Sequence, residues 1–312
     1  MKKQIIITGD LGFIGQHLVK RLIKENFYPI IIDDLSVGNF ENLRLLPKSK
    51  FIFLKCNITN RARLEKNIAR FKPNTIIHLA ALHFIPDCNQ NPSKTLLTNV
   101  VGTQILLDIA HKRNIKNFLF TSSAAVYKPS RHPYKETGPL CPIDIYGLSK
   151  KAAEELVQLY GKYHNIKFII LRLFNVYGLN DPNLHIIPLL LSQLKKSERI
   201  RVGRLDTFRD YIYIDDVIEV LVKILKSRRG FDNSIYNIGT GKKYSGHSLI
   251  KMISKITGRK ILTYRDKNLI RAVDRKILVA NIKKFSKAYS WKPKYNLFQG
   301  LKELLTKLSY IK

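Results

Sequence analysis

The sequence predicts an α/β fold in which a doubly wound parallel sheet is followed by a smaller mixed α/β domain. Two features of the first half support this prediction. Short apolar runs rich in isoleucine alternate with longer segments of helical periodicity. Such runs are typical of strands buried on both faces of a parallel sheet, and their alternation with helices implies right-handed crossovers. The second feature is a glycine-rich turn that joins the first strand to the first helix.

The predicted elements of the first domain, residues 1–178, alternate regularly. The predicted strands are residues 4–8, 29–33, 51–56, 75–80, 117–123 and 168–175. Helices are predicted between them at residues 15–26, 60–71, 97–114 and 143–164. The last helix has an apolar stripe, in which one apolar residue recurs about every 3.6 positions from Leu148 to Leu159.

The second domain, residues 179–312, is predicted to be less regular and to cover a bound substrate. Its predicted helices are residues 186–196, 248–258 and 296–311. Residues 209–226 are predicted as a strand that runs directly into a helix. This segment, taken as residues 209–227, could return to pack on the first domain, so the boundary near residue 178 is soft.

The charge of the chain is strongly positive. The 312 residues include 55 Lys and Arg against 23 Asp and Glu, which gives a net charge of +32. Such a charge could mark a nucleic-acid-binding surface, but the lysines are scattered rather than gathered in blocks. A positive field would also attract a phosphorylated small substrate. Nucleic acid is therefore not the expected partner.

Cysteine usage and hydropathy indicate a reducing compartment. Cys56, Cys88 and Cys141 are widely spaced and form no C-x-x-C pair, so we expect neither a disulfide framework nor a metal site. The first apolar run is too short for a secretory signal, and no segment is long enough to span a membrane. We therefore expect a cytoplasmic protein with no membrane partner.

The glycine-rich turn is typical of a dinucleotide site. Gly9, Gly12 and Gly15 let the backbone approach a pyrophosphate, and the following helix offers free N–H groups and partial positive charge. Asp33 ends the next strand, 24 residues after Gly9, where a carboxylate can accept both ribose hydroxyls and repel a 2′-phosphate. The pattern predicts a Rossmann-type domain that prefers NAD to NADP. The alternatives are an ordinary tight turn and, for Asp33 or Asp34, a solvated one.

Tyr146 and Lys150 form a second candidate site. They lie four residues apart on the predicted helix 143–164 and therefore share one face. A tyrosine is a poor base at neutral pH because its ordinary pKa is about 10. We expect a neighbouring ammonium group and a positively charged nicotinamide to lower that pKa. The alternative is an ordinary helix surface.

Nine motifs in consistent order extend over nearly the whole chain. They are TGDLGFIG, IIDDLSVGN, HLAALHFIP, TNVVGT, FTSSAAVY, YGLSK, LRLFNVYG, RDYIYIDDV and YNIGTG. With these motifs the sequence resembles the extended short-chain dehydrogenase/reductase family, and within it the NAD-dependent nucleotide-sugar epimerases and dehydratases. The resemblance implies bound NAD and a nucleotide-sugar substrate. It also implies a homodimer formed through helices at residues 94–112 and 147–163.

The resemblance implies roles for residues at matching positions. Tyr146 would be the catalytic base, Lys150 would bond the nicotinamide ribose, and Ser123 would donate to the reacting alcohol. Cofactor contacts would come from Gly9, Gly12, Phe13, Ile14, Gly15, Asp33, Ser36, Asn57, Ile58, Leu79, Ala80, Ala81, Asn99, Tyr146 and Lys150. The substrate would contact Ser123, Tyr146, Asn175, Arg209 and Arg271, the last three through its diphosphate.

Three of these roles have alternatives. Asn99 could instead cap a helix. Arg209 could form an ion pair with Asp210 or Asp215. Arg275 could take the place of Arg271.

Two alanines distinguish among the reactions that the resemblance implies. All these enzymes begin by oxidising the sugar at C4, and the 4,6-dehydratases then use an acid and a base directly after the serine. Ala124 and Ala125 stand at those positions and cannot transfer a proton. The resemblance therefore implies a 4-epimerase that acts on a UDP-hexose through a 4-keto sugar. The alternatives are a 4,6-dehydratase or another sugar-modifying member, and, from another class, an RNA-binding protein of this fold.

Overall fold

The computed structural model describes residues 3–9, 11–38, 40–44, 46–270 and 274–311. The chain forms two compact units. Unit 1 is Met1–Lys128, Pro139–Arg172 and Ile218–Tyr236, and unit 2 is Pro129–Gly138, Leu173–Val217 and Asn237–Lys312. The chain therefore passes between the two units at several points rather than once near residue 178. The two domains expected from the sequence stay a prediction.

A seven-stranded sheet forms the centre of unit 1, in the order β11-β6-β5-β4-β1-β2-β3. The strands are β1 Gln4–Thr8, β2 Tyr28–Asp33, β3 Ile52–Lys55, β4 Thr75–His78, β5 Asn117–Ser123, β6 Lys167–Leu173 and β11 Ser234–Ile238. Strands β3, β2, β1, β4 and β5 pair in parallel. The winding direction reverses between β1 and β4, so the carboxyl ends of these two strands open the crevice where such sheets bind ligands. This sheet confirms the predicted doubly wound fold.

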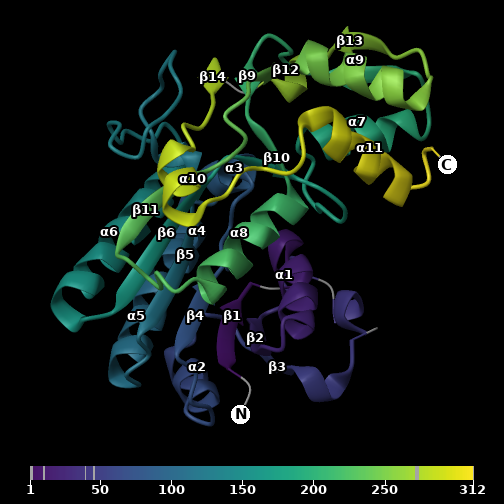
Figure 1. The fold of residues 1–312 in the computed structure, drawn as a ribbon. Coiled ribbons are helices and arrows are strands. Elements are labelled where there is room, and N and C mark those ends of the chain that lie inside the picture. Colours follow the sequence, from purple (N-terminus) through teal and green to yellow (C-terminus); the bar gives the residue numbers. More distant parts are fainter. Residues whose placement is uncertain (1–2, 10, 39, 45, 271–273, 312) are drawn as a thin grey trace. The chain divides into compact units, whose positions relative to one another are not determined.

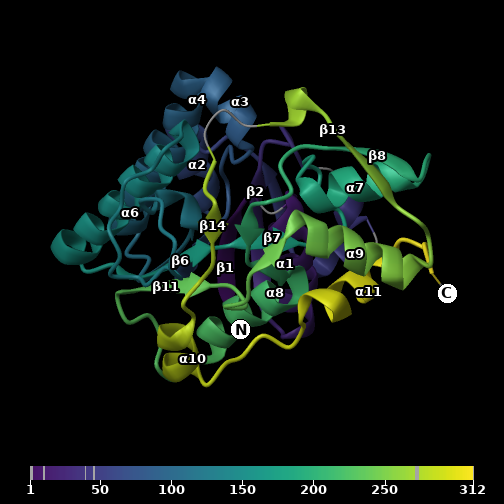
Figure 2. The ribbon, with the colours of Figure 1, turned by 90° about the horizontal axis from the view of Figure 1, so that it is seen from above.

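Helices cover both faces of this sheet (Figures 1 and 2). The helices of this part of the chain are α1 Phe13–Lys24, α2 Arg61–Ile68, α3 Ile85–Gln90, α4 Pro92–Leu96, α5 Gly102–Lys112, α6 Ile145–His164 and α8 Ile214–Lys226, of which α3 and α4 contact α6. Side chains of α2, α5 and α6 form one core with inward residues such as Ile6 and Ile30. The neighbouring Ile5 and Ile7 point to the other face, which α1 and α8 cover. Burial on both sides explains why these strands are apolar throughout.

Short helical segments complete unit 1. They are the 3-10 turns η1 Phe40–Leu43, η2 Lys48–Lys50 and η4 Ala124–Val126, and the π-helical segment η3 Leu97–Val101. Segment η3 joins α4 to α5, so the helix predicted from residue 97 already begins at Pro92. No helix in the described part of the chain is long and apolar enough to cross a membrane.

Unit 2 consists of short strands and four helices among its described residues. The strands are β7 Asn175–Tyr177, β8 Arg199–Val202, β9 Phe208–Arg209, β10 Tyr211–Tyr213, β12 Tyr244–Ser245, β13 Leu262–Arg265 and β14 Ile277–Leu278. The helices are α7 Ile186–Leu194, α9 Gly246–Thr257, α10 Lys283–Tyr289 and α11 Leu297–Lys307, with a 3-10 turn η5 at Lys267–Leu269. Strand β9 pairs with β12 and β14, β7 pairs with β10, and β8 pairs with β13. These short, mixed sheets and their helices agree with the mixed α/β character in the predicted fold class.

Candidate functional site

The glycine-rich turn brings backbone of two strands close together. Gly9 has φ of +70°, which favours glycine, and a Cβ added there would lie 2.4 Å from the Cα of Ala80. Gly12 is the N-cap of α1, in which Phe13 and Ile14 form the first turn, and it offers no side-chain cap. The first N–H groups of α1 therefore receive no side-chain cap from Gly12. Gly15 is buried inside the same helix.

Asp33 is held by backbone at the end of β2. Its carboxylate accepts hydrogen bonds from the N–H of Leu11 at 3.1 Å and of Leu35 at 2.8 Å. Burial raises the pKa of Asp33, and these two hydrogen bonds oppose that rise. Asp34 instead accepts from the N–H of the exposed Ser36 at 2.9 Å, so it forms the solvated turn.

The predicted cofactor contacts after β3 are engaged with other protein groups, whereas those after β4 are partly exposed. Asn57 donates to Asp34 at 2.8 Å and accepts from the N–H and hydroxyl of Thr59. Ile58 is 5% exposed and belongs to the core. Leu79, Ala80 and Ala81 follow β4 directly and are partly exposed.

Helix α6 brings Tyr146 to Ser123. The Asp144 carboxylate caps this helix by accepting from the N–H of Gly147 at 2.7 Å. A Cβ added at Gly147 would lie 2.4 Å from the carbonyl oxygen of Ala125, so glycine permits the close approach of α6 to the end of β5. This approach brings the side chain of Tyr146 near Ser123, close enough for Ser123 to influence the pKa of the phenol.

Lys150 lies one helical turn further and is buried. Its side chain is directed at β5, where Nζ donates to the carbonyl oxygen of Thr121 at 2.8 Å. Nζ also lies 4.7 Å from the centroid of the Phe120 ring. Burial lowers the pKa of Lys150 to about 7, although the Glu154 carboxylate acts in the opposite direction.

The pKa of Tyr146 corrects the expectation drawn from the sequence. Burial raises the pKa of Tyr146 above its ordinary value, and the neighbouring Ser123 side chain only partly opposes this rise. The expected lowering by Lys150 is absent for two reasons. The amino group of Lys150 bonds a backbone carbonyl, and its own charged form is disfavoured by burial.

Asn99 supports the start of α6 rather than capping a helix. It lies within the π-helical segment η3, and its side chain bonds both backbone groups of Leu82 at 2.8 Å. Its Nδ2 also donates to the hydroxyl of Ser149 at 2.9 Å, which in turn bonds the carbonyl oxygen of Tyr146. The helix-cap alternative is therefore wrong. Sequence reasoning missed Ser149, because a serine inside a helix gives no signal of such a bridge.

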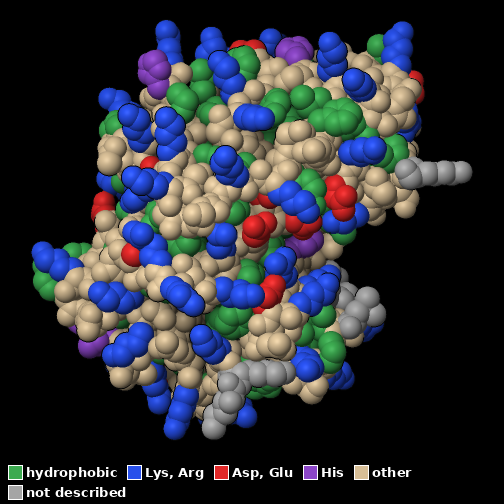
Figure 3. Space-filling model, in the orientation of Figure 1, with side chains coloured by type: hydrophobic (Ala, Val, Ile, Leu, Met, Phe, Trp, Pro, Cys, Tyr) green, Lys and Arg blue, Asp and Glu red, His purple; other side chains and the backbone are tan. Residues whose placement is uncertain are grey.

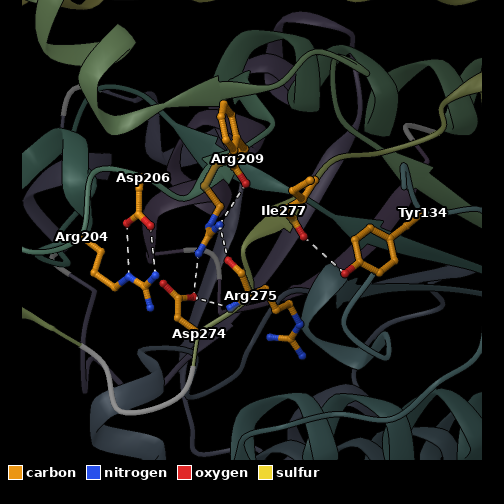
Figure 4. Close-up of polar contacts among 8 residues, drawn as sticks. Tyr134, Arg204, Asp206, Arg209, Asp274, Arg275 and Ile277 are labelled. Carbon is orange, nitrogen blue, oxygen red and sulfur yellow. Dashed lines mark hydrogen bonds and ion pairs between the residues drawn. The ribbon is translucent and has the colours of Figure 1, made fainter. Parts of the chain in front are cut away.

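Unit 2 holds the arginine expected to bind phosphate (Figure 4). Arg209 forms an ion pair of 2.6 Å with Asp274 and donates to the carbonyl oxygens of Phe208 and Arg275. Asp274 replaces the partners that the sequence suggested. A fully buried Asp210 instead accepts from backbone N–H groups, including that of Gly241 at 2.8 Å.

Asn175 lies beside Asp210. Two arginines, Arg271 and Arg275, are the candidates for a second phosphate contact. Both the N–H and the side-chain amide of Asn175 donate to the carbonyl oxygen of Asp210, at 3.0 and 3.1 Å. Arg271 lies outside the described residues. Arg275 is 6% exposed, and its N–H donates to Asp274 at 2.8 Å. Arg204, which precedes β9, pairs with Asp206.

The sequence-predicted residues fall into two groups. Unit 1 holds the glycine turn, Asp33, Ser123, Tyr146 and Lys150, and unit 2 holds Asn175 and Arg209. Within the described ranges, no three His, Cys, Asp or Glu side chains are placed to bind a metal ion. Lys and Arg side chains are spread over the face seen in Figure 3 rather than gathered into one block.

Known proteins match the chain over almost its whole length. A model described as the NAD dependent epimerase/dehydratase family matches residues 5–239. A putative UDP-glucose 4-epimerase of Methanocaldococcus jannaschii is 34% identical over 308 residues, which cover 96% of this chain and 97% of that protein.

Solved structures show the same architecture. The UDP-glucose 4-epimerase of Thermotoga maritima with UDP-glucose has a TM-score of 0.87 at 27% identity, and 98% of each chain is covered. A UDP-N-acetylglucosamine 4-epimerase from Methanobrevibacter ruminantium, in complex with UDP-N-acetylmuramic acid, has a TM-score of 0.88 at 29% identity, and 100% of each chain is covered.

Proposed function

The chain belongs to the NAD-dependent epimerase/dehydratase family, and from that premise we propose that it is a nucleoside-diphosphate-sugar 4-epimerase acting on a UDP-hexose. The names of similar proteins support the substrate class, since those described above are 4-epimerases of UDP sugars. The proposed reaction type depends on the residues at the end of β5. Ser123, which lies near Tyr146, is followed by two buried alanines, Ala124 and Ala125.

The cofactor is NAD, and the residues present fit it. Gly9 and the start of α1, which Gly12 leaves uncapped, suit a pyrophosphate, because it binds backbone N–H groups and needs close approach to the chain. We assign the adenosine ribose to Asp33, whose carboxylate is positioned by two backbone hydrogen bonds. Bound NAD supplies a reversible hydride acceptor for the sugar C4.

We assign the proton transfer to Tyr146. Its phenol oxygen would take the proton of the 4-hydroxyl group and return it at the end of the cycle. Ser123 lies near this phenol and would bond the reacting sugar oxygen. Because burial raises the pKa of Tyr146, the phenolate requires nearby positive charge, which the oxidised nicotinamide would supply.

The alanine pair favours epimerisation over elimination. A 4,6-dehydratase must remove a proton from C5 and protonate the leaving hydroxyl at C6. Ala124 and Ala125 can do neither, and they are 1% and 5% exposed. Epimerisation requires only that the 4-keto sugar present its other face.

We assign the substrate diphosphate to Arg209 and Asn175. The hydrogen bonds of Arg209 use two N–H groups of Nη1 and one of Nη2. Its Nε–H and the second Nη2–H have no partner among the described residues, so the guanidinium can still donate two bonds to a phosphate. Arg271 is the proposed second phosphate contact.

We also propose a homodimer formed through α4, η3, α5 and α6. These helices contact one another and expose apolar side chains. The exposed residues are Leu96, Leu97, Val101, Leu148, Leu159 and Tyr163. A second copy that covers this face would remove it from water, which is favourable.

Product analysis tests the proposed reaction. The purified chain is incubated with UDP-glucose, UDP-galactose, UDP-N-acetylglucosamine and UDP-glucuronic acid, and the products are analysed by NMR and mass spectrometry. We expect at least one of these sugars to give an equilibrium mixture of two C4 epimers of equal mass. A 4-keto sugar lighter by one water would instead identify a dehydratase.

A further inference from the structure

A hollow of about 900 Å³ lies at the edge of the unit 1 sheet where the parallel strands begin. Figure 1 shows this edge of the sheet near the N label. Its wall comes from the first residues of five strands, the segment between α2 and β4, and the end of α8 with the following loop. Every lining residue belongs to unit 1. Gly9 lies five residues after Gln4, the first residue of β1, which corresponds to about 16 Å for five rises of about 3.3 Å. The hollow is therefore distinct from the dinucleotide site.

The charged side chains that line the hollow are all cations. They are Lys3, Arg70 and Lys72, and each is exposed. Among the described residues that line the hollow there is no Asp or Glu, and none of the three cations forms an ion pair with a described carboxylate. Glu25 lies at this edge of the unit but is engaged by Lys226 at 2.7 Å. The hollow therefore has an uncompensated positive charge.

Helix dipoles explain part of the basic charge at this edge, but not the charge inside the hollow. Helices α1, α2 and α8 end here, and Lys24, Lys66 and Lys226 in their last turns stabilise the helix carboxyl ends. Lys3 and Lys72 lie outside these helices, directly before β1 and close before β4. Neither lysine therefore belongs to the last turn of a helix whose carboxyl end it would stabilise.

Aromatic side chains form the other part of the wall. Tyr28, Phe71 and Phe231 line the hollow, and all three are partly exposed. The Arg70 guanidinium carbon lies 6.0 Å from the centroid of the Phe71 ring, so cation and ring stand together. The rim is open at Gly230, where φ is +65° and no atom lies within 4 Å of an added Cβ. Because the three rings line the hollow and are partly exposed, a planar group can reach them.

We propose that this hollow is a second binding site, and that its ligand is a nucleoside phosphate. The base would stack on Phe71 or Phe231, and the phosphates would meet Lys3, Arg70 and Lys72. The volume lies within the range of small-molecule pockets, roughly 300–1,000 Å³. A sugar without an aromatic base would not stack on the rings, and an apolar ligand would not pair with the cations. The site is independent of the proposed epimerase chemistry.

Calorimetric titration of ATP into the full chain tests this proposal. The chain is first saturated with NAD and with UDP, so that the cofactor site and the proposed substrate site are filled. We expect saturable binding of one ATP per chain. Lys3→Gln/Lys72→Gln should weaken it about tenfold or more at low salt, and Phe231→Ala about fivefold or more. The matched control is Lys251→Gln/Lys302→Gln, two exposed lysines of unit 2, which should change the affinity less than about twofold.

Three results would overturn the proposal. One is the absence of saturable ATP binding. Another is equal weakening by the control pair and the hollow pair, which would indicate attraction to the overall charge. The last is inorganic triphosphate binding as tightly as ATP, which would exclude a role for the rings. If Phe231→Ala does not fold by circular dichroism, the lysine pair and the triphosphate comparison still decide.

Discussion

Lys150 is 2% exposed, and its pKa is about 7 rather than the ordinary 10.5 because burial disfavours the ammonium form. The unfolded chain therefore binds this proton more tightly than the folded chain. Below pH 7 the cost of the buried charge is fully present, and it disappears as pH rises toward 10.5. At this residue, stability should increase with pH across that window.

Lys150→Met should reveal this cost. The substitution removes the buried charge but keeps an apolar chain of similar length, so the free energy of unfolding should rise relative to wild type by up to about 5 kcal/mol at pH 6, less the lost bond to Thr121. The difference should shrink steadily as pH rises to about 10. Urea titrations of the cofactor-free chain at several pH values measure it. The control is Lys162→Met, which changes an exposed residue of the same helix and should show no such trend. If the effect of Lys150→Met on the free energy of unfolding does not depend on pH, the assigned cost of the buried charge is wrong.

At the scale of residues, the sequence predicted neighbours along a helix better than partners across the fold. The spacing of Tyr146 and Lys150 follows from helix geometry alone. The partner of Arg209 does not, because Asp274 lies 65 residues away and the nearer acids Asp210 and Asp215 looked equally suitable. The pKa shifts were also beyond the sequence, since they depend on how much water each group loses.

Among the elements, the strand β1, the glycine turn and α1 depend most directly on single positions. Gly9 has a positive φ and faces the backbone of Ala80, whereas Gly12 has a φ of −71° that any residue can adopt. The same element thus contains one position that requires glycine for folding and one that does not. Both matter for an approaching pyrophosphate.

Gly9→Ala should destabilise the chain far more than Gly12→Ala. The left-handed conformation alone costs about 1–2 kcal/mol for alanine, and the 2.4 Å approach to Ala80 adds to it. The added Cβ at Gly12 would stay 3.2 Å from the carbonyl oxygen of Gly9. Urea midpoints without added NAD compare the two variants on folding alone. Equal midpoints would contradict the described turn.

The sequence predicted long elements more reliably than short ones. Six strands and four helices of the first half were recognisable because each repeats its pattern over several residues. Strands of two or three residues, such as β9 and β14, are too short to show a period. The π-helical segment η3 was missed for another reason, since its residues look like any helix and only the bonds of Asn99 reveal its use.

For the whole molecule, the main proposal is that two copies of the chain form a homodimer. The exposed face of η3 and α6 includes Leu97 at 50% and Leu159 at 48% exposure. A stable interface typically buries about 800 Å² per partner, and acidic side chains placed inside it would be desolvated without partners. The overall charge of +32 also means that two copies repel one another at long range, so the apolar contact must outweigh this repulsion.

Leu97→Glu/Leu159→Glu should convert a dimer into a folded monomer. Light scattering with size exclusion gives the mass, and circular dichroism checks the fold. The matched control Leu184→Glu/Leu269→Glu changes two exposed leucines of unit 2 in the same way and should leave the dimer intact. A wild-type monomer, or dissociation by both pairs alike, would refute the proposed interface.

The central claim is that the Tyr146 hydroxyl moves the proton of the sugar alcohol, and Tyr146→Phe tests it most directly. The variant removes one oxygen and keeps the ring, so we expect an unchanged fold and unchanged NAD content, with turnover of the epimerised sugar about 100- to 10,000-fold lower. Tyr163→Phe, at an exposed position of the same helix, is the control and should keep full activity. Turnover by Tyr146→Phe close to that of the wild type would contradict the account.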